Sequence, residues 1–304
     1  MRSALATALA ITMTTAGAVW AQNAPAPTAA PAPPPAAAPV PAAAPKPTIA
    51  KCDNPNALGV ERIVQIDTTG GPGFGFEHFK AYDFLRDHEV VLTFDDGPWP
   101  GNTERVLKAL ADNCTKAIFF PIGKHAGYHP EILKEVAKAG HTIGSHTWSH
   151  KDLTKLTPDE AKAEIEKGIA AVSIALGNKP IGPFFRFPAL RHPPEMLKYL
   201  GTRNIGIFST DMDSFDFKIH KPEQVIKSVM TKLAKHGKGI ILMHDFQKGT
   251  SEAVPELFKQ LKAGGYKVVQ VVGKTPTEPL QEYKDIVLKE MGGGLDEARP
   301  MSSV

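Results

Sequence analysis

The stretch 90–99, "VVLTFDDGPW", changes abruptly from apolar to polar. Its first five residues have the apolar, β-branched character of a buried strand. Asp95 and Asp96 follow side by side, and a Gly-Pro pair then favours a turn. Neighbouring carboxylates repel each other and resist removal from water. Either a cation or another partner offsets that cost, or the pair lies in a solvated turn.

The chain on both sides of this stretch alternates between strand and helix patterns. Such alternation predicts an α/β fold with a mostly parallel sheet covered by helices, and the count suits a barrel of about seven or eight strands. Strands are expected at 62–67, 90–94, 116–122, 141–146, 184–189, 205–211, 239–245 and 267–271, and helices at 103–113, 129–140, 157–177, 193–201, 221–237 and 252–265.

The two ends of the 304-residue chain differ in composition from its centre. Residues 1–21 have a charged start, an apolar stretch and a small-residue cleavage site, which is typical of a secretory signal peptide. Residues 22–48 are almost all alanine and proline and favour an extended, disordered linker. One catalytic domain is expected at 49–273, followed by a C-terminal tail at 274–304 with weak helical character.

Charge and cysteine content narrow the function classes. The net charge of +3 comes from nearly balanced acids and bases, so we expect no nucleic-acid partner. We also expect no stable membrane span after signal cleavage and a secreted or periplasmic location. Cys52 and Cys114 are the two cysteines, and an even number in an exported chain suggests a disulfide, with two buried free thiols as the alternative.

Titratable residues lie at or just past the ends of several predicted strands. They are Asp95, Asp96, His146, Arg186, the acidic residues between Asp211 and Asp216, and His244. In parallel α/β barrels the carboxyl ends of the strands carry the functional site. We therefore expect these side chains to meet at one mouth.

The segment "SHTWSH" places His146 and His150 four residues apart, so that both rings can face one way. Two histidines and one of the two aspartates would hold a divalent ion and leave a position open for water. Zn²⁺ is the first expectation, with Co²⁺ and Ni²⁺ as alternatives. An isolated pair with this spacing is more often a pair of surface histidines, and the adjacent aspartates favour the metal interpretation. We interpret most of the other histidines as surface or structural residues.

Five motifs resemble the polysaccharide deacetylase family, the NodB homology domain of carbohydrate esterase family 4. They occur in the family's order between about 88 and 272: "TFDDGP" (93–98), "HTWSH" (146–150), "RFPAL" (186–190), "DSFDF" (213–217) and "LMH" (242–244). The resemblance implies a distorted (β/α) barrel that hydrolyses the N-acetyl group of N-acetylglucosamine units in peptidoglycan, chitin oligomers or an exopolysaccharide. We also expect a monomer.

The resemblance assigns a role to each motif residue. Asp96, His146 and His150 would hold the metal, and Asp95 would be the general base, fixed by Arg186. Asp216 would orient and charge His244, the general acid. For the substrate, the backbone N–H of Ala189 would face the oxyanion, and Phe217 and Leu242 would line the acetyl-methyl pocket.

Two motifs depart from the family pattern. Ala189 and Leu190 replace the usual Tyr-Gly, and Phe217 replaces a tryptophan. Arg191 adds a second basic residue that would contact an anionic substrate or pack at the surface. Two other functions are therefore kept as alternatives: a different amide hydrolase on this scaffold, and a catalytically silent glycan-binding envelope protein.

Overall fold

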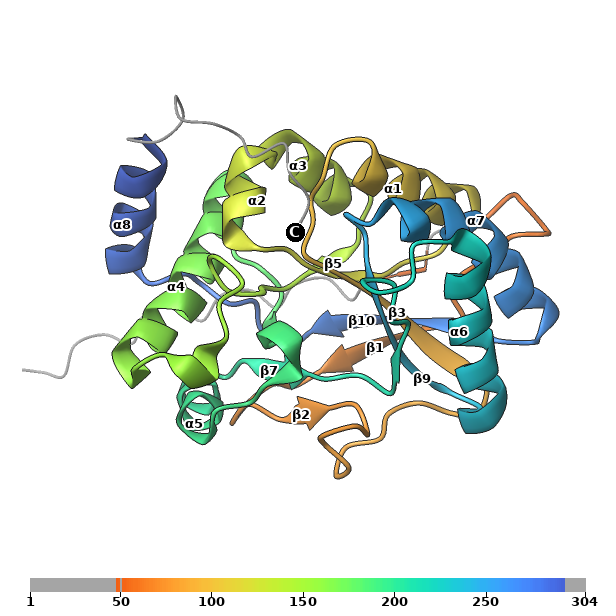
Figure 1. Ribbon diagram of the computed structural model, residues 1–304, viewed down its shortest axis with the longest axis horizontal. Coiled ribbons are helices and arrows are strands. Elements are labelled where there is room, and N and C mark those ends of the chain that lie inside the picture. The colour runs from red at the N-terminus through yellow and green to blue at the C-terminus, as the bar shows by residue number, and fades with distance from the viewer. Residues whose placement is uncertain (1–47, 50, 293–304) are drawn as a thin grey trace, which may run out of the picture. The chain divides into compact units, whose positions relative to one another are not determined.

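The structure is a computed structural model that describes residues 48–49 and 51–292 (Figure 1). Its strands are short, and every pair of them is parallel. The strands are β1 (Arg62–Ile66), β2 (Gly73–Phe74), β3 (Glu89–Asp95), β4 (Ile118–Phe120), β5 (Thr142–Ile143), β6 (Phe184–Phe185), β7 (Gly206–Phe208), β8 (Met212–Asp213), β9 (Gly239–His244) and β10 (Lys267–Gly273).

Helices follow most of the strands and cover them from outside (Figure 1). They are α1 (Asn102–Asp112), α2 (Gly123–Tyr128), α3 (Pro130–Lys138), α4 (Pro158–Ala175), α5 (Pro194–Thr202), α6 (Pro222–His236), α7 (Lys248–Ala263) and α8 (Gln281–Gly292). The six predicted helices are all present. The short helix α2 was not predicted, and the terminal helix α8 lies in the segment that was expected to have only weak helical character.

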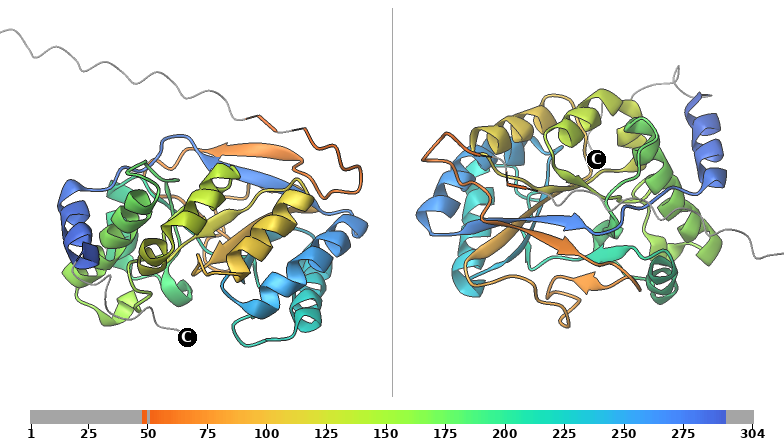
Figure 2. Two further views of the ribbon diagram at one scale, coloured as in Figure 1. Left: turned by 90° about the horizontal axis from the view of Figure 1, so that it is seen from above. Right: turned by 180° about the vertical axis from the view of Figure 1, so that it is seen from behind.

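The strands form a distorted barrel. β9 lies along one edge of β3, while β10 and β4 share its other edge. β4 continues to β5, and a parallel bridge from Ser145 to Phe185 leads on to β6 and β7. β8 pairs with the far side of β9, and β1 runs beside β10 (Figure 2). The predicted fold class, one domain with about seven parallel strands in a distorted barrel, is confirmed.

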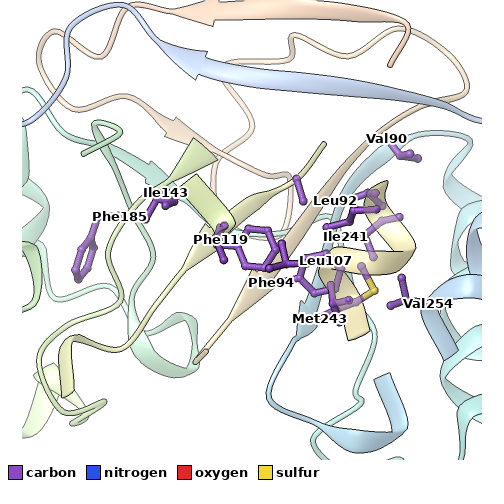
Figure 3. Packing of buried hydrophobic residues seen from close by; sticks show 14 of the residues in the cluster. Val90, Leu92, Phe94, Leu107, Phe119, Ile143, Phe185, Ile241, Met243 and Val254 are labelled. Carbon is purple, nitrogen blue, oxygen red and sulfur yellow. The ribbon is translucent and has the colours of Figure 1, made fainter. Parts of the chain in front are cut away.

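Alternation along the central strands separates two apolar clusters. In β3, Leu92 and Phe94 join the larger cluster, which packs against the covering helices (Figure 3). Val91 points to the opposite side and joins the smaller cluster inside the barrel. Because side chains alternate along a strand, Thr93 and Asp95 lie on the same interior side as Val91. The interior is thus apolar at one end and polar at the carboxyl end of β3.

Cys52 and Cys114 form a disulfide, which confirms the predicted bridge. It joins the segment before β1 to the residues just after α1, across 62 positions of sequence. A closed loop of that length stabilises the fold by about 4 kcal/mol in the chain-entropy account.

The predicted signal peptide, and the linker apart from its last residue, lie outside the described residues. In the part of the chain that is described, no helix has the length and apolar character needed to cross a bilayer. The segment predicted as a tail contains α8, whose Val287 is fully buried against α4 and Trp148.

Candidate active site

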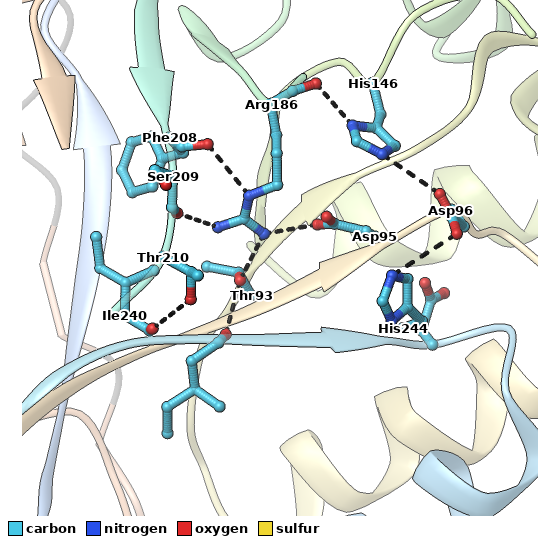
Figure 4. Close-up of polar contacts among 12 residues, drawn as sticks. Thr93, Asp95, Asp96, His146, Arg186, Phe208, Ser209, Thr210, Ile240 and His244 are labelled. Carbon is cyan, nitrogen blue, oxygen red and sulfur yellow. Dashed lines mark hydrogen bonds and ion pairs between the residues drawn. The ribbon is translucent and has the colours of Figure 1, made fainter. Parts of the chain in front are cut away.

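A buried ion pair forms the base of the site. Arg186 is fully buried, and its Nη1 donates to Asp95 Oδ1 and to Thr93 Oγ1, each at 2.7 Å (Figure 4). Its remaining N–H groups donate to the carbonyls of Phe208 and Ser209. A buried guanidinium with this many partners is rigidly held. It therefore fixes the Asp95 carboxylate at the end of β3.

The second aspartate faces two histidines. Asp96 Oδ1 lies 3.5 Å from His146 Nε2 and 3.6 Å from His150 Nε2. One potential ligand atom from each residue lies within 4.8 Å of those of the other two. Asp96 Oδ1 is buried without a hydrogen-bond partner among the described residues, which is unusual for a carboxylate oxygen. Ligands about 2.0–2.2 Å from a tetrahedral ion lie roughly 3.4 Å apart, so the three residues fit a divalent metal.

The protonation state of His146 also suits a metal ligand. Its Nδ1 lies 2.7 Å from the carbonyl oxygen of Arg186, which requires a proton on Nδ1 and leaves the Nε2 lone pair free. Burial lowers the pKa of His146 to about 4, so the ring is neutral near pH 7. Burial alone would raise the pKa of Asp96, but nearby His244, His150 and His146 lower it overall.

A histidine–carboxylate pair lies across the mouth. His244 Nδ1 is 2.6 Å from Asp216 Oδ1, and the His244 backbone N–H donates to Asp216 Oδ2 at 2.7 Å. Thr250 Oγ1 donates to the same carboxylate. Burial alone would lower the pKa of His244, but the attraction and hydrogen bond of Asp216 raise it to about 10. The ring is therefore a proton donor at neutral pH, with Nε2 3.8 Å from Asp96 Oδ2.

The site loops hold several residues in left-handed backbone conformations. Ten non-glycine residues in the described part of the chain have positive φ, and six of them lie on these loops: Asp96, Thr147, His150, Ala189, Leu190 and Phe215. Such conformations cost of order 1–3 kcal/mol each and gather where function requires them. The candidate metal ligands Asp96 and His150, with φ of 72° and 57°, are among them.

The three predicted substrate-binding residues lie on segments that also carry site residues. Phe217 is 43% exposed, and its ring centroid is 5.9 Å from that of His244. Leu242 is buried beside Thr93 in the β3–β9 register. Ala189 is exposed on the turn that follows Arg186. Arg191, the extra basic residue, forms an ion pair with Asp152 on the surface.

One predicted position is wrong. Asp211 was expected at the mouth, because a single strand was predicted over 205–211. The chain instead leaves β7 at Phe208 and re-enters the barrel as β8, so Asp211 precedes a strand. Its carboxylate accepts from the backbone N–H groups of Phe76 and Ile240, the latter near the start of β9. Asp211 therefore lies at the opposite end of the barrel from His244.

Four supporting residues were not predicted. Thr93 lies two residues before Asp95, so the strand period could have revealed it. His125 Nδ1 lies 2.6 Å from the carbonyl oxygen of Asp96, and Thr250 bonds Asp216. Asp245 is buried behind the first motif and accepts from Gly97 N–H and the Thr103 hydroxyl. No local pattern marks the last three, because their partners are distant in sequence.

The carboxylate held by Arg186 and the charged His244 both border the candidate metal centre, so the mouth offers a base and an acid beside a site for water, as hydrolysis requires. The family model for polysaccharide deacetylase matches residues 85–205. The chain is 32% identical over 203 residues to the peptidoglycan-N-acetylglucosamine deacetylase of Bacillus cereus, a match that covers 64% of this chain and 72% of that protein. The chain belongs to the polysaccharide deacetylase family, a family of carbon–nitrogen (amide) bond hydrolases.

Two further comparisons agree. The peptidoglycan-N-acetylmuramic acid deacetylase PdaC of Bacillus subtilis is 31% identical over 187 residues, which are 60% of this chain and 38% of that longer protein. The solved structure of the Bdellovibrio bacteriovorus peptidoglycan deacetylase Bd3279 superposes with a TM-score of 0.66 at 33% identity. That superposition covers 75% of this chain and 63% of the other.

Proposed function

We propose that this protein is a secreted or periplasmic, metal-dependent N-deacetylase of glycans that contain N-acetylglucosamine. The observation that carries the proposal is the arrangement at the mouth. The Asp95–Arg186 pair and the His244–Asp216 pair both border the Asp96, His146 and His150 triad. Relatives named for deacetylation of peptidoglycan and chitin support the substrate class.

In this proposal Asp96, His146 and His150 hold a divalent ion, with Zn²⁺ as the first candidate. Such an ion would supply Lewis acidity for the acetyl carbonyl and for a water molecule. Asp95 removes a proton from the attacking water, and Arg186 holds that carboxylate in position. His244 gives its Nε2 proton to the departing nitrogen. Water and the amide are thereby converted into acetate and a free amine.

The remaining residues shape the substrate pocket. The Ala189 backbone N–H faces the developing oxyanion, which a preorganised donor stabilises. Leu190 has a φ of 54°, so the turn is formed without the glycine that usually occupies this position. Phe217 and Leu242 enclose the acetyl methyl group. A phenylalanine at 217 keeps an aromatic wall but lacks an indole donor.

The proposed activity is tested by measuring metal content and acetate release from a panel of N-acetylated glycans: peptidoglycan strands, chitin oligomers and an N-acetylated exopolysaccharide. We expect bound divalent metal and acetate release. Asp95→Asn should keep the metal and lose about 10²- to 10⁴-fold in rate, because the general base is removed. Asp112→Asn, a change of the same kind on exposed α1, should have no effect.

The same assay separates the two alternatives. A silent glycan-binding protein would retain glycan without releasing acetate, and the Asp95→Asn variant would bind it equally well. A different amide hydrolase would release a product other than acetate. If the protein holds no divalent ion, and added Zn²⁺ or Co²⁺ produces no acetate from any glycan, the proposal is wrong.

A further inference from the structure

Trp148 lies between His146 and His150 in sequence, yet its side chain points away from them into a separate apolar pocket. The indole is only 7% exposed and packs with Ala170 and Ala171 of α4 and with Val287 of α8. Met291 of α8 packs against the same group. We call the buried group of Trp148, Ala170, Ala171 and Val287 the Trp148 pocket. Helix α8 thus forms one wall of the pocket that holds Trp148, the middle residue of the loop 146–150. We call this segment the histidine loop.

The neighbouring helices leave room for this packing. A β-carbon at Gly123 would lie 2.9 Å from the indole of Trp148, and one at Gly127 would lie 2.6 Å from Met291 Cε. Lys167 of α4 forms an ion pair with Glu290 of α8 at 2.7 Å, and its ammonium lies 5.1 Å from the centre of the indole. Contacts from α2, α4 and α8 therefore converge on one side chain.

The loop needs such support because its backbone is strained. Thr147 and His150, on either side of Trp148, have φ of 67° and 57°. A left-handed conformation is especially unfavourable for the β-branched Thr147. The Trp148 backbone N–H donates to the Glu164 carbonyl at 2.8 Å, and its carbonyl accepts from Lys124 N–H at 2.9 Å. These bonds fix the backbone of Trp148, and the pocket fixes its side chain.

We propose that α8 positions the metal site: by closing the Trp148 pocket, it holds His146 and His150 in the geometry that binds the ion. The inference rests on the proposed metal centre. It assigns a role to a segment that lies outside the family match at 85–205. Val287 and Met291 are positioning residues, because they act on the ligands through Trp148 and touch neither the substrate nor the metal.

A purely structural role for α8 predicts a different result. In that case, loss of Val287 packing would lower the melting temperature without changing the affinity of the folded protein for metal. If α8 positions the histidines, loss of Val287 packing should instead weaken metal binding by the folded protein. The loop would then have to regain its strained conformation when the ion binds. Metal affinity compared at matched thermal stability separates the two roles.

The test uses the full chain and Zn²⁺ alone as the probe. Its dissociation constant is measured by competition with a chromogenic chelator, well below the melting temperature. Val287→Ala and Met291→Ala should each raise the constant about 10-fold, the lower end of the range for groups that hold metal ligands in place directly. Leu288→Ala is the matched control on the same helix, because Leu288 is 52% exposed. Val229→Ala in α6 is the stability control, because it truncates a fully buried residue on a helix that does not contribute to the pocket.

The inference stands if both α8 variants bind Zn²⁺ more weakly while the two controls stay within about two-fold of the wild type. Wild-type affinity in Val287→Ala and Met291→Ala overturns it, and so does an equal loss in Val229→Ala, which would make general destabilisation the cause. A wild-type protein that binds no Zn²⁺ would instead overturn the proposed metal centre itself. A truncation after Gly292, which keeps α8, should bind Zn²⁺ like the full chain, and weakened binding there would contradict the assignment to α8.

Discussion

The charge on His244 depends most on one carboxylate, that of Asp216, which makes Asp216→Asn an informative perturbation. Asp216 is fully buried and accepts hydrogen bonds from the His244 ring, the His244 backbone and Thr250. With this carboxylate present, the pKa of His244 is raised to about 10. Burial opposes that effect and lowers the pKa. Without Asp216, burial is opposed only by the weaker attraction of Asp96 and Asp95, so we expect the pKa to fall to about the ordinary value of 6.5 or below.

The expected loss follows from these two values. At pH 7 a ring with a pKa of about 10 is almost entirely protonated. A ring with a pKa of about 6.5 or less is protonated in at most about a quarter of the molecules. The rate at pH 7 should therefore fall at least about 4-fold from protonation alone, and further because the ring is no longer oriented. The basic limb of kcat/KM should move to lower pH, so that the optimum lies below pH 6.5.

The assay is the pH profile of acetate release, paired with an NMR titration of the His244 ring. Thr250→Val is the control, because it removes one hydrogen bond to Asp216 and keeps the charge. Its basic limb should stay near that of the wild type. The reasoning is refuted if Asp216→Asn keeps the wild-type basic limb, or if its His244 ring still titrates near pH 10.

Three further changes test other parts of the structure. His150→Ala should abolish metal retention and leave the circular dichroism spectrum unchanged, and unaltered metal content would contradict the ligand assignment. Arg186→Met leaves Asp95 buried without its partner, so the free energy of unfolding should drop by about 3–5 kcal/mol in urea denaturation; a loss below about 1 kcal/mol would show that water or another group replaces the guanidinium. Replacing both Cys52 and Cys114 with serine should lower stability by about 4 kcal/mol while kcat/KM is retained, since the bridge lies outside the site; a parallel loss of kcat/KM would connect the bridge to the active site.

The contribution of the His244–Asp216 pair to the free energy of unfolding should depend on pH. The pKa of His244 is raised in the folded protein, so the pair stabilises the fold fully below pH 6.5 and loses that contribution as pH rises through about 10. The pKa of Asp216 is lowered, mainly by His244 after the opposing effect of burial. Its contribution is present above about pH 4 and is lost as the pH falls.

The parts of the site that follow local rules could be predicted from the sequence. Asp95 and His244 end the apolar strands β3 and β9, and the period of two places both on the interior side. The pairing register sets the two residues directly opposite each other. Parallel strands bring their carboxyl ends to one edge, so the meeting of separate motifs also follows. The resemblance to a family then supplied roles that no spacing rule contains.

The parts that failed depend on contacts between distant segments. Asp211 was misplaced because the break between β7 and β8 has no strong turn signal in "FSTDMD". Helix α8 was expected only as a tail with weak helical character, because it is mostly polar. Among its described residues only Val287 is fully buried. A single buried side chain gives almost no periodic signal, although its packing reaches the loop that carries two candidate metal ligands.

The φ of Asp96 changes the direction in which strand alternation alone would place its side chain. Strand alternation would send the side chain of Asp96 to the face opposite Asp95, into the apolar layer beneath the helices. Its φ of 72° ends the strand and turns the carboxylate toward the mouth, while His125 Nδ1 contacts its carbonyl. The next residue must then be small, because a β-carbon at Gly97 would lie 2.1 Å from Asp245 Oδ2. The order Asp-Asp-Gly therefore follows from the geometry. The strand fixes the first carboxylate, and the left-handed turn redirects the second. The glycine leaves room for the buried Asp245, which anchors the turn.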